Sequence, residues 1–239
     1  MIALILGVYI RSLPMKIRPE TGKPGLWDIT TNNWCLGPDL DPWLFTRYAK
    51  TIVENGSLPK IDMMRYVPLG FDNSKELKMV SYFIVFNHKI LKFFGNNNFM
   101  YAAVVTPVIL FALTIIAYFL FVREIFSRKG KNLKANLIAL AATFLMIVTP
   151  SFLSRTIAGI PEKESTAFFF MFLSFFIFLK SWKTENLKVA VVLSILAGIA
   201  TGLMGLTWGG VIYVFVSISI ASFAAFIAYF TRRVSLPRS

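Results

Sequence analysis

Two pairs of acidic residues, each pair split by one residue, are the part of this sequence best suited to chemistry. They are Asp39-Leu40-Asp41 and Glu162-Lys163-Glu164, and each places two carboxylates close together. Hard divalent cations such as Mg²⁺ and Mn²⁺ prefer oxygen ligands, and neighbouring carboxylates repel one another unless a cation lies between them. The two clusters therefore predict a metal site, provided that the fold brings them to one place.

Each acidic cluster also has a purely structural explanation. Asp41 precedes a proline and an apolar helical pattern, so it suits the N-cap of a helix, where a capping Asp contributes about 0.5–2 kcal/mol. Glu162 and Glu164 precede a long apolar run, where acidic side chains offset the helix dipole by about 0.3–1 kcal/mol. Arg155 and Lys163 are alternative partners that would neutralise the second pair. The sequence leaves these explanations and the metal site open.

The elements that must position these residues are membrane-spanning helices. The chain has 239 residues, of which 56% are hydrophobic and 15% aromatic, and its mean hydropathy is +0.65. A helix needs roughly 20 mostly apolar residues to span a bilayer. Such runs occupy residues 99–122, 136–152, 166–182, 189–206 and 208–230. Because they are apolar throughout, whereas barrel strands alternate in polarity, the predicted fold is all-α, a polytopic transmembrane helical bundle.

The chain is expected to divide into four segments. Residues 1–13 are interpreted as the end of a truncated first transmembrane helix, 14–98 as an external loop, 99–231 as a bundle of about five spans, and 232–239 as a short tail. Within the loop, apolar residues recur at helical spacing from Pro42 to a stop at Gly56, and again over residues 75–94. The second pattern is amphipathic, which predicts a helix lying on the membrane surface.

The basic residues behind the net charge of +13 lie where membrane topology places them, so we exclude nucleic acid as a partner. Basic residues gather in alternate short loops and in the tail, as expected for cytoplasmic segments. The acidic clusters and the turn at Thr207 would then be extracytoplasmic, in a multi-pass protein of the cell membrane. The predicted cytoplasmic residues are Arg123, Arg128, Lys129, Lys131, Lys134, Lys180, Lys183, Lys188, Arg232, Arg233 and Arg238.

Few other residue types are available for a site. The single cysteine, Cys35, allows no intrachain disulfide, and the single histidine, His88, excludes a histidine-based zinc site. Trp208 precedes Gly209-Gly210 in a short external turn. It is either an interfacial tryptophan that supports helix packing or one wall of a site at the membrane surface.

Three segments together resemble the N-terminal half of the catalytic subunit of oligosaccharyltransferase. They are Asp41-Pro42-Trp43-Leu44-Phe45-Thr46-Arg47, Arg155-Thr156-Ile157-Ala158-Gly159-Ile160-Pro161-Glu162-Lys163-Glu164 and Trp208-Gly209-Gly210. They come in the order of that family and on its expected side of the membrane. The resemblance is to the archaeal type called AglB, which is related to bacterial PglB. It covers most of the chain, and its second segment is the most specific.

The resemblance implies a membrane glycosyltransferase of the GT-C kind. Such an enzyme moves a glycan from a polyprenyl or dolichyl phosphate carrier to the asparagine of an Asn-X-Ser/Thr sequon in an acceptor polypeptide, and it uses Mn²⁺ or Mg²⁺. The resemblance further implies that Asp41 is catalytic and binds the metal, and that Glu162 and Glu164 complete the metal site. Asp39, Arg155 and Trp208 are candidate residues that would support this site.

The chain also departs from that family. Glu162 is longer than the usual aspartate at its position, and the Trp-Trp-Asp motif and a later loop glutamate do not occur here. We therefore expect an N-terminal fragment that is inactive alone.

Three other functions remain open at this stage. One is a related GT-C transferase that uses another lipid-linked sugar, against which the second acidic pair argues. Another is a transporter or channel, which would place ionisable residues within its spans, whereas these runs are almost free of charge. The third is a membrane assembly subunit with no chemistry.

Overall fold

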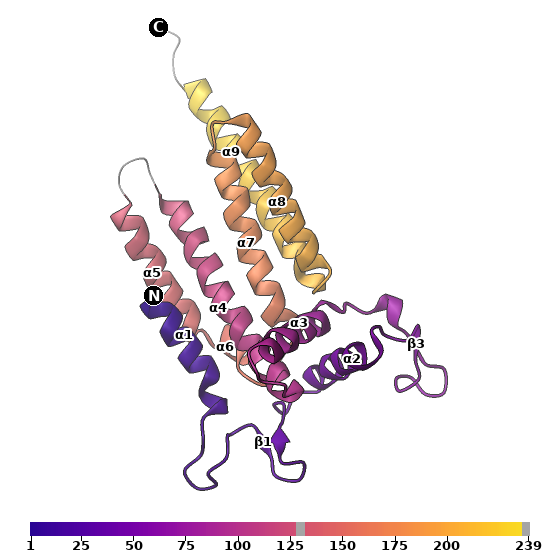
Figure 1. The fold of residues 1–239 in the computed structure, drawn as a ribbon. Helices are drawn as coiled ribbons and strands as arrows, with labels where there is room; N and C mark the ends of the chain where they lie inside the picture. The colour runs from indigo at the N-terminus through magenta and orange to yellow at the C-terminus, as the bar shows by residue number, and fades with distance from the viewer. Residues whose placement is uncertain (128–131, 236–239) are drawn as a thin grey trace.

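Long apolar helices lying side by side make up the body of the protein (Figure 1). The computed structural model describes residues 1–127 and 132–235, with side chains described as far as Thr231. The bundle helices are α1 (Ile2–Ser12), α4 (Phe99–Phe126), α5 (Leu133–Val148), α6 (Pro150–Thr156), α7 (Lys163–Lys183), α8 (Leu187–Gly205) and α9 (Ile212–Ser235). Of the basic residues assigned to the cytoplasmic side, Arg128, Lys129, Lys131 and Arg238 lie outside the described residues, as does the second half of the predicted tail, residues 236–239.

The described helices confirm an all-α membrane fold. Helices α4, α7, α8 and the segment Gly209–Thr231 are long and apolar enough to cross a bilayer, and the bent pair α5 and α6 makes a fifth span if it is counted as one. Helix α4 is central, because it packs against α1, α3, α5 and α7. Phe111 and Ile115 on α4 meet Ile147 on α5 and Phe172 on α7 in one buried cluster.

The second predicted span is broken rather than continuous. A single helix was expected over residues 136–152, but α5 ends at Val148 and α6 begins at Pro150 with a bend of 65°. Proline lacks the backbone donor that a helix needs and forces the residue before it into an extended conformation. Thr149 accordingly has φ −65° and ψ 122°. The break turns α6 towards the end of the bundle where the acidic residues lie.

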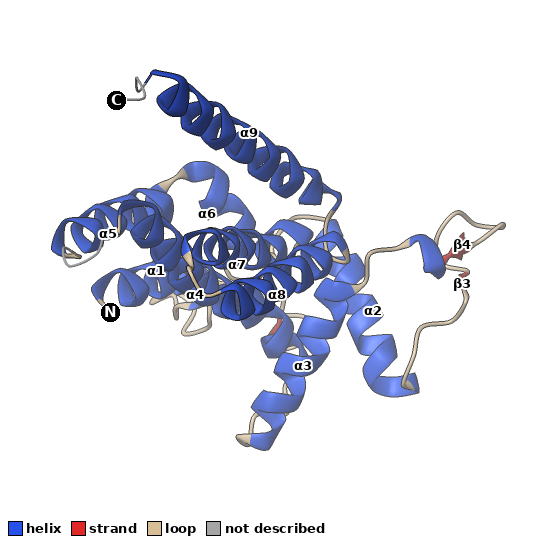
Figure 2. Cartoon of the chain, turned by 90° about the horizontal axis from the view of Figure 1, so that it is seen from above, coloured by secondary structure: helices blue, strands red, loops and turns tan. Residues whose placement is uncertain are grey.

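Two helices of the segment between α1 and α4 lie across one end of the bundle, and Figure 2 shows that they project sideways from it. They are α2 (Asp41–Asn55) and α3 (Met79–Phe93). Gly56 ends α2 in the left-handed conformation at φ +79°, as its position predicts. The prediction of Asp41 as the N-cap is wrong by one residue, because the helix begins at Asp41 itself.

Short turns and hairpins connect these helices. The predicted helix over residues 75–94 begins late, because the Asp72 side chain accepts from Ser74 N and starts a separate 3-10 turn. The connecting elements are η1 (Leu13–Met15), β1 (Trp27–Asp28) paired antiparallel with β2 (Asn33–Trp34), β3 (Ile61–Asp62) paired antiparallel with β4 (Phe71–Asp72), η2 (Asn73–Lys75) and η3 (Gly209–Val211).

The close approach of α1 to α4 depends on a glycine and yields a stability prediction. A Cβ added to Gly7 would lie 2.3 Å from Ile115 Cδ1, whereas one added to Gly198 on α8 would have nothing within 4 Å. We expect Gly7→Val to lower the free energy of unfolding by about 1–3 kcal/mol through overpacking, and Gly198→Val to change it little. Thermal or denaturant unfolding in detergent measures both. Equal stability of the two variants would contradict the tight α1–α4 contact.

Candidate functional site

The structure brings one residue of each acidic cluster to a single place. Asp39 lies in the loop before α2, Glu162 lies immediately before α7, and their carboxyl groups are close enough for each to shift the pKa of the other. Arg155, in the last turn of α6, places Nη1 2.6 Å from Glu162 Oε2 and 3.7 Å from Asp39 Oδ2. We call Asp39, Arg155 and Glu162 the carboxylate site.

An extended segment between α6 and α7 holds the carboxylate site together. Its backbone is tied to three separate parts of the chain, each through a bond of 2.9 Å: Ala158 N donates to Arg11 O, Gly159 N donates to Val104 O, and Gly159 O accepts from Gly37 N. The last bond lies two residues before Asp39 and three before Glu162. It therefore fixes the distance between the two acidic clusters, which are far apart in sequence.

Burial gives the two carboxyl groups different protonation behaviour. Glu162 is only 2% exposed, and its burial raises the pKa of the carboxyl to about 7, although the hydrogen bond from Arg155 opposes the shift. Its interaction with the Glu162 carboxyl, more than any other cause, lowers the pKa of Asp39. Asp39 is therefore ionised at neutral pH, whereas burial disfavours the charged form of Glu162. A cation placed beside Glu162 would favour its charged form.

The donor atoms fit a hard divalent cation in type but not in number. Oε1 of Glu162 is buried without a hydrogen-bond partner, and such an orphaned carboxylate oxygen suits a cation that prefers oxygen. However, within residues 1–127 and 132–235 no group of three or more His, Cys, Asp or Glu side chains could hold a metal. Asp41 is exposed in the first turn of α2, and Glu164 is half-buried in the first turn of α7. Neither joins Asp39 and Glu162 in such a group.

Lys163 does not neutralise the acidic pair that flanks it. Its Nζ lies 2.8 Å from Oε1 of Glu76, and Glu76 Oε2 lies 2.9 Å from Arg65 Nη1. The structural alternative of charge neutralisation thus holds for Arg155 and fails for Lys163. Sequence reasoning missed Glu76, whose only signal was that it is an acidic residue in the basic stretch Lys75-Glu76-Leu77-Lys78.

Trp208 packs against α7 at the turn between α8 and α9. Its ring lies 6.3 Å from that of Phe168 and 5.9 Å from that of Tyr213. Phe168 is one helical turn after Glu164, so Trp208 covers the beginning of the helix that carries the second acidic pair. A Cβ on Gly210 would lie 2.2 Å from the indole, which explains the need for glycine there. These contacts favour the packing interpretation of this turn.

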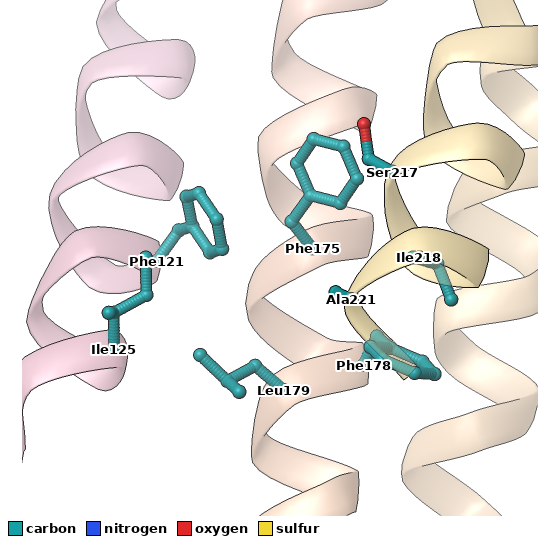
Figure 3. A pocket seen from close by; sticks show the side chains of 8 residues that line it. All are labelled: Phe121, Ile125, Phe175, Phe178, Leu179, Ser217, Ile218 and Ala221. Carbon is teal, nitrogen blue, oxygen red and sulfur yellow. The ribbon is translucent and has the colours of Figure 1, made fainter. Parts of the chain in front are cut away.

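A separate groove is lined by apolar side chains and one hydroxyl, that of Ser217. Figure 3 shows an apolar pocket of about 360 Å³ between α4, α7 and α9, lined by Phe121, Phe175, Phe178 and Ile218 among others. Its residues on α7 lie in the second half of that helix, whereas Glu162 precedes its first turn. The groove therefore suits hydrocarbon and lies apart from the carboxylate site.

Comparison with known proteins decides the family. The family model "Oligosaccharyl transferase STT3, N-terminal" matches residues 30–237. The chain belongs to the STT3 family. The match includes all three residues of the carboxylate site. With its membrane-length helices, this STT3 chain is a multi-pass membrane protein. No curated protein sequence matches it.

Solved structures of an oligosaccharyltransferase from Archaeoglobus fulgidus share the fold of this STT3 chain. The complex with Zn and sulfate aligns with TM-score 0.68 and 22% identity over 89% of this chain and 26% of that one. AglB from the same organism, in complex with an inhibitory peptide and a dolichol-phosphate, aligns with TM-score 0.66 and 22% identity over 89% of this chain and 24% of that one. The Archaeoglobus fulgidus oligosaccharyltransferase tethered with an acceptor peptide containing the NVT sequon aligns with TM-score 0.67 and 22% identity over 89% of this chain and 24% of that one. This chain thus spans about a quarter of their length.

The glycine at the centre of the extended segment provides a test of the site's framework. Gly159 has φ +85°, and an added Cβ would lie 2.6 Å from Leu26 Cδ1 and 3.1 Å from Gly37 N. Gly22 has φ +64° with nothing within 4 Å, so it is a matched control for backbone strain alone. We expect Gly159→Ala to lower the free energy of unfolding by about 1–3 kcal/mol more than Gly22→Ala. Equal losses in unfolding experiments would show that Gly159 is not crowded.

Proposed function

We propose that this chain is the N-terminal membrane part of an oligosaccharyltransferase. Such an enzyme transfers a glycan from a polyprenyl or dolichyl phosphate carrier to the asparagine of a sequon in an acceptor polypeptide. The observation that carries the proposal is the meeting of Asp39 and Glu162 beside Arg155, in a chain of the STT3 family. Two acidic clusters far apart in sequence converge on one end of the bundle, beside a cation that suits phosphate.

We assign the carboxylates of this site to metal binding and to the acceptor amide. Glu162 and Glu164 are proposed ligands of Mn²⁺ or Mg²⁺ together with Asp41, and the position of Asp39 adds it to this set. The bound cation would offset negative charge that develops on the leaving phosphate oxygen. Asp41 is exposed at the start of α2, where its carboxylate is free to accept from the acceptor N–H. That bond would weaken the delocalisation that makes an amide nitrogen a poor nucleophile.

Arg155 is assigned to the phosphate of the carrier. Its guanidinium is about half exposed, although one edge pairs with Glu162. A small open pocket borders it, lined by Asp39, Leu40, Ser154 and Ile160. A planar guanidinium donates two parallel hydrogen bonds to a phosphate. Arg155 therefore has the geometry to hold an anionic leaving group close to the carboxylates.

Mutation of the carboxylates tests the assignment of the metal site. We expect the purified chain to bind Mn²⁺ and Glu162→Gln to weaken this binding by at least about tenfold, or roughly 1.4 kcal/mol, because it removes a charged ligand. In a full-length enzyme that contains this chain, we expect Asp41→Asn to reduce glycosylation of a sequon peptide by about a hundredfold or more. Electron paramagnetic resonance measures Mn²⁺ binding, and peptide glycosylation measures activity.

Glu20→Gln is the matched control for both measurements, because Glu20 is exposed in the same external segment and lies outside the carboxylate site. It should bind Mn²⁺ and glycosylate peptide as the unchanged protein does. Full metal-dependent activity of the Asp41→Asn enzyme would defeat the role of Asp41. Unchanged Mn²⁺ affinity of the Glu162→Gln chain would defeat the metal site.

We further propose that the carboxylate site faces the extracytoplasmic side, as the basic loops indicate. In a Cys35→Ser background, we expect a cysteine at exposed Gly22 to react with a membrane-impermeant thiol reagent in intact cells. A cysteine at Thr184, between α7 and α8, should react only after the cells are opened. The opposite pattern would reverse the topology and place the site in the cytoplasm.

A further inference from the structure

Arg11 is a buried cation at the end of an apolar helix. It lies in the last turn of α1 and is 0% exposed, although every other residue from Ile2 to Ser12 is uncharged. A charge at the edge of a bilayer is costly unless it has partners, and such residues are usually functional. The site as described above uses only the backbone oxygen of Arg11, which leaves its side chain to be explained.

The guanidinium of Arg11 joins the two helices of the broken span. Nη1 donates to Ile147 O at 2.8 Å, and Nε donates to Thr156 Oγ1 at 2.7 Å. The last carbonyls of a helix have no partner within it, so a cation at the C-terminus of α5 is favourable. The guanidinium carbon also lies 4.0 Å from the centre of the Phe111 ring on α4.

Arg11 therefore forms hydrogen bonds at both ends of α6. Ile147 lies just before this short helix, Thr156 is its last residue, and Ala158 N just beyond it donates to Arg11 O at 2.9 Å. Thr156 Oγ1 also donates to Phe152 O at 2.5 Å, so its hydroxyl links Arg11 to the α6 backbone. A helix of two turns that follows a 65° bend has few internal bonds to fix its orientation.

We propose that Arg11 is a positioning residue for the carboxylate site. By fixing the orientation of α6 and of the first residues of the extended segment, it places Arg155 beside the two carboxylates and aligns Gly159 with Gly37. Asp39 and Glu162 meet only while that alignment holds. The inference rests on the proposed function for its catalytic meaning, but the coupling of Arg11 to the site geometry is testable without activity.

Amide hydrogen exchange on the purified chain measures this coupling directly. Arg11→Lys keeps the charge but cannot form two fixed hydrogen bonds from one planar group. Thr156→Val keeps the shape of the side chain and removes the hydroxyl. We expect each variant to speed exchange about tenfold over residues 157–160 and over residues 37–41.

Gly7→Val is the control, because it crowds the same helix chiefly against Ile115 Cδ1, reaches the Ile147 side chain only at an ordinary contact distance of 3.4 Å, and removes no donor or acceptor of these hydrogen bonds. Under conditions in which every variant is folded, it should leave exchange in both segments unchanged. Two results would overturn the proposal. One is wild-type protection in Arg11→Lys; the other is equal acceleration in Gly7→Val, which would reduce Arg11 to a general contribution to stability.

Mn²⁺ affinity then separates this inference from the proposed function. We expect Arg11→Lys to lower the affinity about tenfold, and the double variant with Thr156→Val to lower it no further, because both changes break one link. An unchanged affinity would show that the site does not depend on Arg11. An unaltered chain that binds no Mn²⁺ would instead refute the proposed metal site, and hydrogen exchange alone would then decide the role of Arg11.

Discussion

The extended backbone between α6 and α7 is the constraint on which the rest of the site depends. Three of its peptide groups bond to α1, α4 and the loop before α2, so one short segment is held by parts of the chain that are far apart in sequence. Gly159 makes this possible, because a Cβ there would collide with Leu26 and crowd Gly37. Its bond to Gly37 holds the backbone before Asp39 beside the backbone before Glu162, and Arg155 then contacts both carboxylates.

Around that segment, charges are paired so as to leave the acidic site only partly neutralised. Arg155 satisfies one oxygen of Glu162, and the other is buried with no partner. Lys163, the nearest cation in sequence, is held instead by Glu76, which also binds Arg65. Burying such charges is expensive unless each is paired. The segment between α1 and α4 thus holds a competing cation away from the site and also supplies one of its carboxylates.

The sequence predicted the helices well and the detailed geometry poorly. Long apolar runs, the stop at Gly56 and the placement of both acidic clusters at helix N-termini were readable, because periodicity and composition report local structure. The break at Pro150 was missed because the apolar pattern runs through it. The meeting of Asp39 with Glu162, the diversion of Lys163 to Glu76 and the burial of Arg11 depend on contacts between distant residues, which no local pattern encodes. The assignment of Asp41 and Glu164 to the metal stays a prediction.

The sequence separation of these contacts has a consequence for biosynthesis. Glu76 and Lys163 are 87 residues apart, and Arg11 and Thr156 are 145 apart. At about 5–20 residues per second, a ribosome needs roughly 4–17 s to reach Lys163 after it has made Glu76. The interval between Arg11 and Thr156 is longer. Through these intervals the side chain of Arg11 lacks its partners on α5 and α6, and Glu76 has Arg65 but not Lys163. The first helix and its loop therefore cannot settle as they emerge, and the final arrangement waits until α7 is in the membrane.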